Sequence, residues 1–151
     1  MGVLQSLQKF AEKTSAPGGG TIKNQLNTKE SIVANPFCHV ELNTTDVKQA
    51  KDFYTKLFDW KLEDMESPGG GYTMIKVGEG TGGGMMKNPI PGAPSFWLAY
   101  VLVDDIEAST KKAKSLGASV MRDVTEIPGI GWFSIIADPT GAHLALWKAK
   151  A

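Results

Sequence analysis

The sequence has one cysteine among 151 residues, no net charge and no long apolar run. A single thiol, Cys38, excludes an internal disulfide and a thiolate metal cluster, and it suits a reducing compartment. Sixteen basic and sixteen acidic residues leave no overall charge to attract nucleic acid or an anionic membrane. No stretch approaches the roughly 20 apolar residues that span a bilayer, and the N-terminus lacks a signal peptide's apolar core. We therefore expect a cytoplasmic protein with no nucleic-acid or membrane partner.

The N-terminus carries an amphipathic pattern. Apolar residues at helical spacing predict a short helix over residues 2–13: Val3, Leu4, Leu7, Phe10 and Ala11. A Pro-Gly-Gly-Gly run at residues 17–20 ends it, and the polar stretch beyond predicts a linker. At about three turns the helix needs a surface to lie on, either on this protein, on a neighbouring subunit, or on a membrane or partner. We place residues 1–34 in this extension and residues 35–148 in one domain.

The domain repeats itself. Thr45 or Asp46 is a candidate helix N-cap in the first half, and Asp104 or Asp105 in the second. Adding 59 carries Asp46 to Asp105, and adding 60 carries the turn at Gly69 to the turn at Gly129. Each half is typical of a strand, a helix and three further strands, over residues 35–88 and 94–148. We therefore predict an α+β fold of two tandem βαβββ units whose mixed sheets curl around a cleft.

Each half has an apolar helical stripe. In the first half the stripe consists of Val47, Ala50, Phe53, Tyr54, Leu57 and Phe58. In the second half it consists of Ile106, Ser109, Ala113 and Leu116, and Gly117 follows where a helix end favours a left-handed residue. These stripes are the faces that we expect to pack on the sheet.

The strand from Pro36 to Leu42 combines an apolar face with a polar one. Alternation places Cys38, Val40 and Leu42 on one face and Phe37, His39 and Glu41 on the other. The apolar face predicts packing beneath a helix, with Cys38 as an inert core thiol. The other face presents an imidazole beside a carboxylate.

Four motifs stand in order along the domain: His39-Val40-Glu41-Leu42 with Asp46, Ala50 and Phe53-Tyr54; Val103-Asp104-Asp105-Ile106; Asp138-Pro139 with Gly141; and Leu146-Trp147. With the two βαβββ units, they resemble the vicinal oxygen chelate (VOC) superfamily, the glyoxalase, bleomycin-resistance and extradiol-dioxygenase group. That superfamily contains isomerases, lyases, dioxygenases, epimerases and non-catalytic drug binders. The resemblance therefore implies a fold and leaves the reaction open.

In metal-dependent members, the resemblance implies a divalent ion held by side chains from the first and last strands of each unit. His39 occupies the first ligand position. Its counterparts are apolar: Leu98, Met85 or Met86, and Ala145. One imidazole supplies a small part of the affinity that a divalent cation needs. We therefore expect a degenerate metal site, with either no cofactor or an unknown divalent metal.

A rearranged site is the alternative, because positions two apart on a strand share a face. Glu41 then lies beside His39, Tyr100 beside Leu98, and His143 beside Ala145. These groups could form a displaced metal site, an acid–base pair, or a polar floor that orients a ligand. We assign His39 and Glu41 as candidate catalytic residues and His39 as the one candidate metal ligand. The candidate ligand-binding residues are Tyr72, Met85, Met86, Tyr100, Trp132 and His143.

Three functions remain open at this point. The first is a protein that binds a small organic molecule in the cleft between the units, which the methionine-rich apolar lining suits. The second is an enzyme of the lyase, isomerase or dioxygenase type with a rearranged site around His39 and Glu41. The third is an oligomeric interaction module in which the N-terminal helix mediates assembly. We expect a homodimer, because members of the resembled family commonly pair their units across subunits.

Overall fold

The computed structural model describes residues 35–66 and 70–151. The helix and linker predicted for residues 1–34 lie outside these ranges. The described elements are, in order, β1 (Phe37–Thr44), α2 (Val47–Leu57), β2 (Lys61–Met65), β3 (Tyr72–Lys76), β4 (Gly83–Lys87), β5 (Phe96–Leu102), α3 (Ile106–Ser115), β6 (Ser119–Ile127), β7 (Gly131–Ala137) and β8 (His143–Ala149). Each half therefore follows the predicted βαβββ order.

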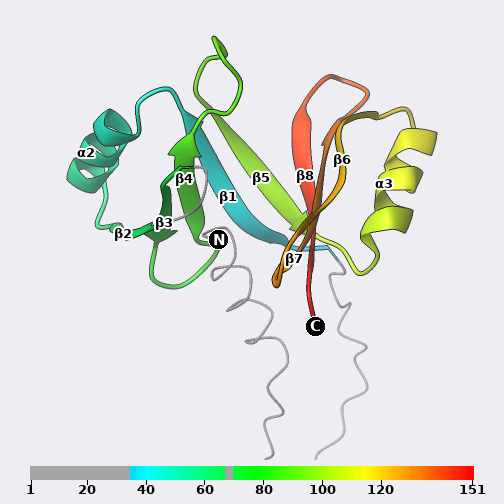
Figure 1. The fold of residues 1–151 in the computed structure, drawn as a ribbon, viewed down its shortest axis with the longest axis horizontal. Helices are drawn as coiled ribbons and strands as arrows, with labels where there is room; N and C mark the ends of the chain where they lie inside the picture. Colours follow the sequence, from blue (N-terminus) through cyan, green and yellow to red (C-terminus); the bar gives the residue numbers. More distant parts are fainter. Residues whose placement is uncertain (1–34, 67–69) are drawn as a thin grey trace, which may run out of the picture.

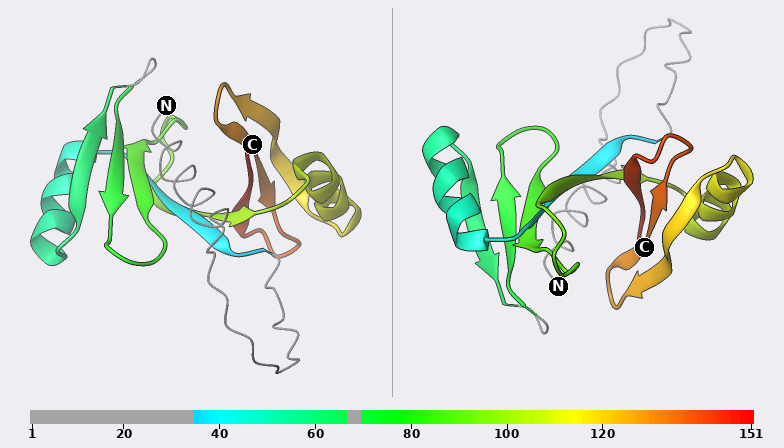
Figure 2. Two further views of the ribbon diagram at one scale, coloured as in Figure 1. Left: turned by 90° about the horizontal axis from the view of Figure 1, so that it is seen from below. Right: turned by 90° about the horizontal axis from the view of Figure 1, so that it is seen from above.

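The eight strands form one mixed sheet in the order β2-β3-β4-β1-β5-β8-β7-β6. β1 and β4 are parallel, as are β5 and β8, and the antiparallel pair of β1 and β5 joins the two units. The sheet bends so that α2 and α3 lie outside it, at opposite ends (Figures 1 and 2). The predicted α+β fold of two units with a curled sheet is confirmed. We call the sheet face turned away from the helices the inner face, and the face that carries them the outer face.

Both helices begin as the sequence predicts. Asp46 accepts a hydrogen bond from the Gln49 amide at 2.9 Å, and Asp105 accepts one from the Ala108 amide at 2.9 Å. These N-caps satisfy amides that the first helical turn leaves unpaired. Neither α2 nor α3, the two helices of the described ranges, is long and apolar enough to cross a membrane.

The stripe of α2 is only partly used for packing. Residues from its inward side, with Tyr54 the largest, cover a core of Leu42, Ile75 and Met85. Phe53, Leu57 and Phe58 are instead exposed. The prediction that the whole stripe packs on the sheet is therefore wrong, because the helix contacts the sheet along a narrower face than six apolar residues provide.

The buried side of α3 differs from the predicted apolar stripe of that helix. Ile106 is buried as predicted, but the next buried residue is Thr110, and Leu116 is 69% exposed. The Thr110 hydroxyl lies 2.7 Å from the Ile106 carbonyl, to which it donates, and 2.8 Å from the Ser134 hydroxyl of β7. A threonine can be buried here because its only polar atom has partners. Gly117 ends the helix with a positive φ of 96°, as predicted.

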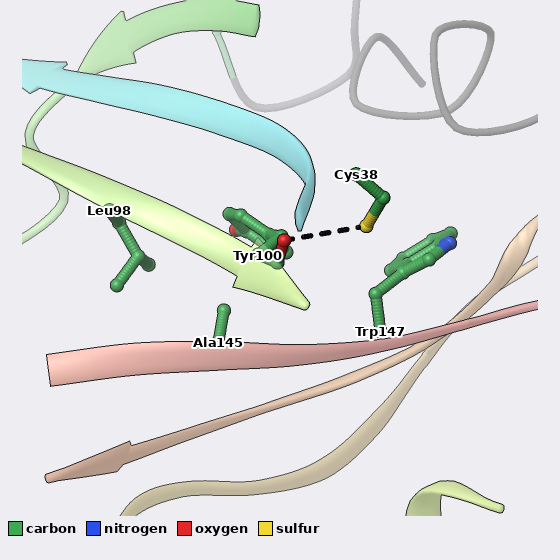
Figure 3. Packing of buried hydrophobic residues seen from close by; sticks show 5 residues of the cluster. All are labelled: Cys38, Leu98, Tyr100, Ala145 and Trp147. Carbon is green, nitrogen blue, oxygen red and sulfur yellow. Dashed lines mark hydrogen bonds between the residues drawn. The ribbon is translucent and has the colours of Figure 1, made fainter. Parts of the chain in front are cut away.

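The inner face of the second unit forms an apolar core with one residue from β1. Cys38 packs there with Leu98, Tyr100, Ala145 and Trp147 (Figure 3). The predicted face shared by Cys38 and Leu42 is wrong, because Leu42 belongs to the core beneath α2. A register shift between Phe37 and His39 interrupts the alternation of β1. Burial raises the pKa of Cys38 to about 12, consistent with an inert thiol.

Candidate functional site

Five polar side chains gather on the inner face near the centre of the sheet. His39, Glu41 and Asn43 come from β1, Tyr72 from β3 and Tyr100 from β5. His39 is fully buried, and the exposed fraction of the other four does not exceed 5%. We call these five residues the polar cluster. Burying so many polar groups is costly unless they bind one another.

Hydrogen bonds connect the polar cluster through Glu41. Tyr72 Oη lies 2.9 Å from His39 Nε2 and donates to Glu41 Oε2 at 3.1 Å. Tyr100 Oη donates to Glu41 Oε1 at 3.2 Å, and Asn43 Nδ2 donates to the same oxygen at 3.3 Å. The Tyr100 ring also meets the His39 ring edge to face, with centroids 5.6 Å apart. Each carboxylate oxygen is therefore satisfied.

Gly84 allows Tyr72 to join this network. β4 lies between β3 and β1, so the phenol of Tyr72 must cross β4 to reach Glu41. Gly84 is the β4 residue paired with both Glu41 and Met74. A Cβ at position 84 would lie 1.8 Å from Tyr72 Oη and 2.2 Å from Cζ. The absent side chain therefore provides the space that the phenol occupies.

Burial shifts every titratable group of the cluster toward its neutral form. It lowers the pKa of His39 from 6.5 to about 4. It also raises the pKa of Glu41, while the hydrogen bonds from Tyr72, Asn43 and Tyr100 act in the opposite direction. The pKa values of Tyr72 and Tyr100 are raised by burial first and then by the nearby Glu41 charge. Near neutral pH the imidazole and both phenols are therefore uncharged.

Two buried polar atoms of the inner face have no hydrogen-bond partner among the described residues: His39 Nδ1 and Trp147 Nε1. With Glu41 ionised, Tyr72 donates its single hydroxyl hydrogen to the carboxylate, so its oxygen accepts from His39 Nε2–H. The neutral imidazole then carries a lone pair on Nδ1. Protonation of Glu41 permits the reverse direction, in which Tyr72 donates to Nε2 and Nδ1 carries the hydrogen. His39 Nδ1 can thus accept or donate one hydrogen bond.

The donor set does not fit a divalent metal ion. Among the described residues no group of three or more His, Cys, Asp and Glu side chains could hold one. Gly84 lies opposite Glu41 in the β1–β4 pair, and Ala145 lies opposite Tyr100 in the β5–β8 pair. Neither has a donor atom in its side chain, and Leu98 of β5, which is paired with Glu41 of β1, has none either. One imidazole, one carboxyl group and two neutral phenols remain, which is a poor set for zinc or a related ion.

The structure brings together some of the residues selected from the sequence. His39, Glu41, Tyr72 and Tyr100 all belong to the polar cluster. Met86 pairs with Tyr72 across strands β3 and β4, so it borders the cluster. The catalytic and ligand-binding roles of these residues stay predictions.

The other selected residues lie elsewhere. Met85 is fully buried in the core beneath α2, because alternation along β4 turns it to the face opposite Gly84 and Met86. Trp132 packs with Val103, Ile106 and Leu146 on the side of α3. His143 is exposed at the first position of β8. The predicted placement of Met85 and Trp132 at the cleft is therefore wrong, whereas His143 shares the face of Ala145, as predicted, but lies at the exposed end of β8.

Sequence reasoning missed three residues of the inner face. Asn43 continues the two-residue period of His39 and Glu41, so strict alternation could have found it. Gly84 belongs to a run of three glycines at residues 82–84, and such a run indicates a turn rather than a position in a binding site. Trp147 carries the second unpaired nitrogen, and a Cβ at Gly131 would come within 2.7 Å of its indole ring. Neither close approach has a signal in the sequence.

Comparisons with known proteins identify relatives of the described domain. Residues 37–146 match the family described as Glyoxalase/Bleomycin resistance protein/Dioxygenase superfamily. The Mycobacterium tuberculosis (strain CDC 1551 / Oshkosh) protein named "Putative glyoxylase CFP32" is 40% identical over 117 residues, covering 74% of this chain and 44% of that protein. The "Anthracycline biosynthesis protein DnrV" of Streptomyces peucetius is 30% identical over 123 residues, covering 72% of this chain and 45% of that protein. The chain thus spans less than half the length of these curated relatives.

Solved structures resemble the fold. Methylmalonyl-CoA epimerase from Mycobacterium tuberculosis superposes with a TM-score of 0.58 at 14% sequence identity, over 76% of this chain and 88% of the epimerase. At that identity the likeness concerns the fold alone, since one fold hosts several reactions.

Proposed function

Because this chain belongs to the glyoxalase/bleomycin resistance protein/dioxygenase superfamily, we propose that its inner face binds a small organic molecule through the polar cluster, without a divalent metal ion. The observation that carries the proposal is the unpaired Nδ1 of the buried His39. No other buried polar side-chain atom of the cluster lacks a hydrogen-bond partner. An orphaned atom at the end of a satisfied network is a position that a ligand atom can complete.

The chemistry of the cluster defines the class of ligand. With Glu41 ionised, Nδ1 accepts, so the ligand offers a hydroxyl or N–H group. The neighbouring side chains are neutral and largely apolar, with Met86 beside Tyr72 and the core of Leu98 and Trp147 on the other side. Such surroundings favour an uncharged, partly aromatic molecule with a few polar groups. The name of the relative DnrV connects it with anthracyclines, whose aglycones are uncharged polycyclic phenols.

Binding requires side chains over the cluster to move, since His39 is fully buried. Met86 is suited to that movement, because it is only partly buried and methionine has three rotatable side-chain bonds. The strands beneath it are held by the sheet and need not change. We therefore expect slow binding with little change in secondary structure.

The chain contains two histidines, which gives a matched pair of variants. An anthracycline aglycone serves as the probe, and its intrinsic fluorescence is titrated with the wild type, His39→Ala and His143→Ala. We expect His39→Ala to weaken binding at least tenfold, about 1.4 kcal/mol, and His143→Ala to change it less than twofold. Equal affinities of the two variants would remove His39 from the site. Metal analysis of the purified protein provides the second arm: stoichiometric zinc, iron, nickel or manganese would contradict binding without a metal.

A second candidate function is acid–base catalysis by the same cluster. The observation that favours it is the continuous path from Glu41 through Tyr72 to His39, with steps of 3.1 and 2.9 Å. A buried carboxyl group with a raised pKa can take up a proton, and the phenol can relay it to the imidazole. Methylglyoxal is a suitable first substrate, given the name of the relative CFP32. Turnover that is lost in both Glu41→Gln and Tyr72→Phe but retained in Asn43→Ala would support this function over simple binding.

A further inference from the structure

The Tyr72 hydroxyl lies between two groups that can each accept its hydrogen. It is 3.1 Å from Glu41 Oε2 and 2.9 Å from His39 Nε2, and all three side chains are buried. A phenol carries one hydrogen, so Tyr72 can donate to only one of these partners and must accept from the other. The direction of both hydrogen bonds is therefore decided by one hydroxyl.

The surroundings of Glu41 hold that hydroxyl in one direction. Tyr100 Oη and Asn43 Nδ2 both donate to Oε1, at 3.2 and 3.3 Å. No lysine or arginine of the described residues forms an ion pair with this carboxyl group. A carboxylate can only accept, so Tyr72 donates to Oε2 and accepts from His39 Nε2–H. The hydrogen of the imidazole is then on Nε2 and its lone pair on Nδ1.

What His39 offers to a ligand thus depends on residues that the ligand does not touch. Its Nδ1 is buried without a partner among the described residues, and the proposed function places a ligand atom beside it. A lone pair on Nδ1 accepts from an N–H or hydroxyl group and repels a carbonyl oxygen, whereas an N–H at the same position does the opposite. A site with a buried polar group strongly rejects a molecule that leaves this group unpaired.

We propose, on the basis of that function, that Glu41 is a specificity-determining residue. Acting through Tyr72, it keeps the hydrogen of His39 on Nε2 and so selects uncharged aromatic ligands that donate a hydrogen bond to Nδ1. Glu41 is a positioning residue in this role, because Tyr72 lies between it and the imidazole. The same arrangement rejects molecules whose only polar group is a carbonyl oxygen.

Replacing Glu41 with glutamine should reverse the selection. Tyr100 and Asn43 donate to the Oε1 position, so the amide oxygen of the glutamine occupies it, and the amide nitrogen takes the place of Oε2. That nitrogen can only donate, so Tyr72 accepts from it and donates to His39 Nε2. The imidazole hydrogen moves to Nδ1, and the ligand must then supply an acceptor.

The imidazole gives the first test, without a ligand. In the full chain labelled with ¹⁵N, the ring nitrogen that carries the hydrogen has a lower chemical shift than the one that does not. At neutral pH we expect the hydrogen of His39 on Nε2 in the wild type and on Nδ1 in Glu41→Gln. Glu79→Gln removes the same charge at an exposed position between β3 and β4 and should resemble the wild type. His143, at the exposed start of β8, is the internal reference.

Tyr72→Phe keeps the carboxylate and removes the hydroxyl between Glu41 and His39, so it tests the path even if Glu41→Gln does not fold. We expect the ring nitrogens of His39 in this variant to show signals averaged over both forms, because nothing then selects one of them. A hydrogen that stays on Nε2 in Glu41→Gln or in Tyr72→Phe would overturn the proposal. A hydrogen on Nδ1 in the wild type would overturn it as well.

Two flat three-ring molecules of similar shape test the choice of ligand. Carbazole offers one N–H donor, fluorenone offers one carbonyl acceptor, and neither is charged. By isothermal titration we expect the wild type and Glu79→Gln to bind carbazole at least tenfold more tightly than fluorenone, and Glu41→Gln to show the reverse order.

The two tests separate a failure of this inference from a failure of the proposed function. A hydrogen that stays on Nε2 in Glu41→Gln, while His39→Ala still weakens binding, would overturn the specificity role of Glu41 alone. A hydrogen that moves as expected without any change in the preference between the probes would mean that His39 does not contact the ligand. That result, or no binding of either probe, would contradict the proposed function together with this inference.

Discussion

The inner faces of the two units differ although their backbones repeat. In the first unit this face presents His39, Glu41 and Asn43 from β1 and Tyr72 from β3, whereas in the second it presents mainly Leu98, Ala145 and Trp147. The register of β1 and β5 pairs His39 with Tyr100 and Glu41 with Leu98. His39 thus faces Tyr100, the repeat counterpart of Glu41, and Glu41 faces Leu98, the repeat counterpart of His39.

That difference explains the electrostatic character of the site. The apolar half removes water from the polar half, and burial is the main cause of the shifted pKa values of His39 and Glu41. Two polar halves would provide more donors for a metal ion, and two apolar halves would provide none. One of each gives a dry hydrogen-bonding cluster in which the imidazole and both phenols are uncharged near neutral pH.

The largest expected effect comes from filling the space over β4. Gly84→Ala places a Cβ where the phenol of Tyr72 lies, so the ring must leave and both of its hydrogen bonds are lost. We expect a loss of about 4 kcal/mol in the free energy of unfolding, from overpacking and from unpaired buried groups together. Urea denaturation measures it.

Gly71→Ala is the control, because a Cβ at position 71 has nothing within 4 Å and the residue has no positive φ. We expect that variant to differ from the wild type by less than about 0.5 kcal/mol. Similar losses in the two variants would show that the effect belongs to glycine replacement in general. The cost would then not arise from the contact with Tyr72.

The second prediction concerns pH. The folded pKa of His39 is about 4, below its ordinary value of 6.5, so the unfolded chain binds more protons between these values. Stability therefore rises with pH from about 4 to 6.5, by about 3 kcal/mol, and falls on acidification through that window. His39→Gln should remove this dependence, whereas His143→Gln should retain it. Unfolding by urea between pH 4 and 7 gives the curves.

Glu41 acts with the opposite sign. Its raised pKa means that the folded state holds a proton more firmly than the unfolded chain, so its contribution is present below about 4.5 and declines as pH rises. The His39 measurement is therefore repeated in a Glu41→Gln background, where only the imidazole of the pair titrates. A pH dependence that persists there without His39 would contradict the assignment.

The fold could be predicted because two independent signals in the sequence agreed: the helix N-caps and the spacing between equivalent turns. Asp46 and Asp105 begin equivalent helices, and the offset of about 60 residues aligned the turns before β3 and β7. Such signals are local, since a cap or a turn acts on the few residues around it. The exposed Leu116 shows the limit: an apolar residue at helical spacing does not pack when it lies past the last turn of the helix.

The site was harder to predict because its geometry depends on strand order. Alternation along β1 placed Glu41 beside His39, and the repeat placed Tyr100 near both. The contact with Tyr72 requires β3 to lie two strands away from β1 and Gly84 to lie between them. A one-residue shift at Cys38 also moved that side chain from one core to the other. Neither fact can be obtained from a single strand pattern.

The smallest expected effect separates the two tyrosines, one from each unit. Tyr72 binds both His39 and Glu41, whereas the hydroxyl of Tyr100 binds Glu41 alone. Tyr72→Phe should therefore cost about 2 kcal/mol and Tyr100→Phe about 1 kcal/mol, since each lost hydrogen bond contributes about 1 kcal/mol. Urea denaturation with a shared m-value resolves that difference.

The double variant Tyr72→Phe/Tyr100→Phe completes the cycle. Both hydroxyls donate to the carboxyl group of Glu41. When both are removed, Asn43 is its remaining hydrogen-bond partner. We expect the combined loss to exceed the sum of the single losses by at least about 0.5 kcal/mol, as residues that share a buried partner do. Strict additivity would mean that the polar half and the apolar half stabilise the protein independently, and the dry cluster would then not be a property of their combination.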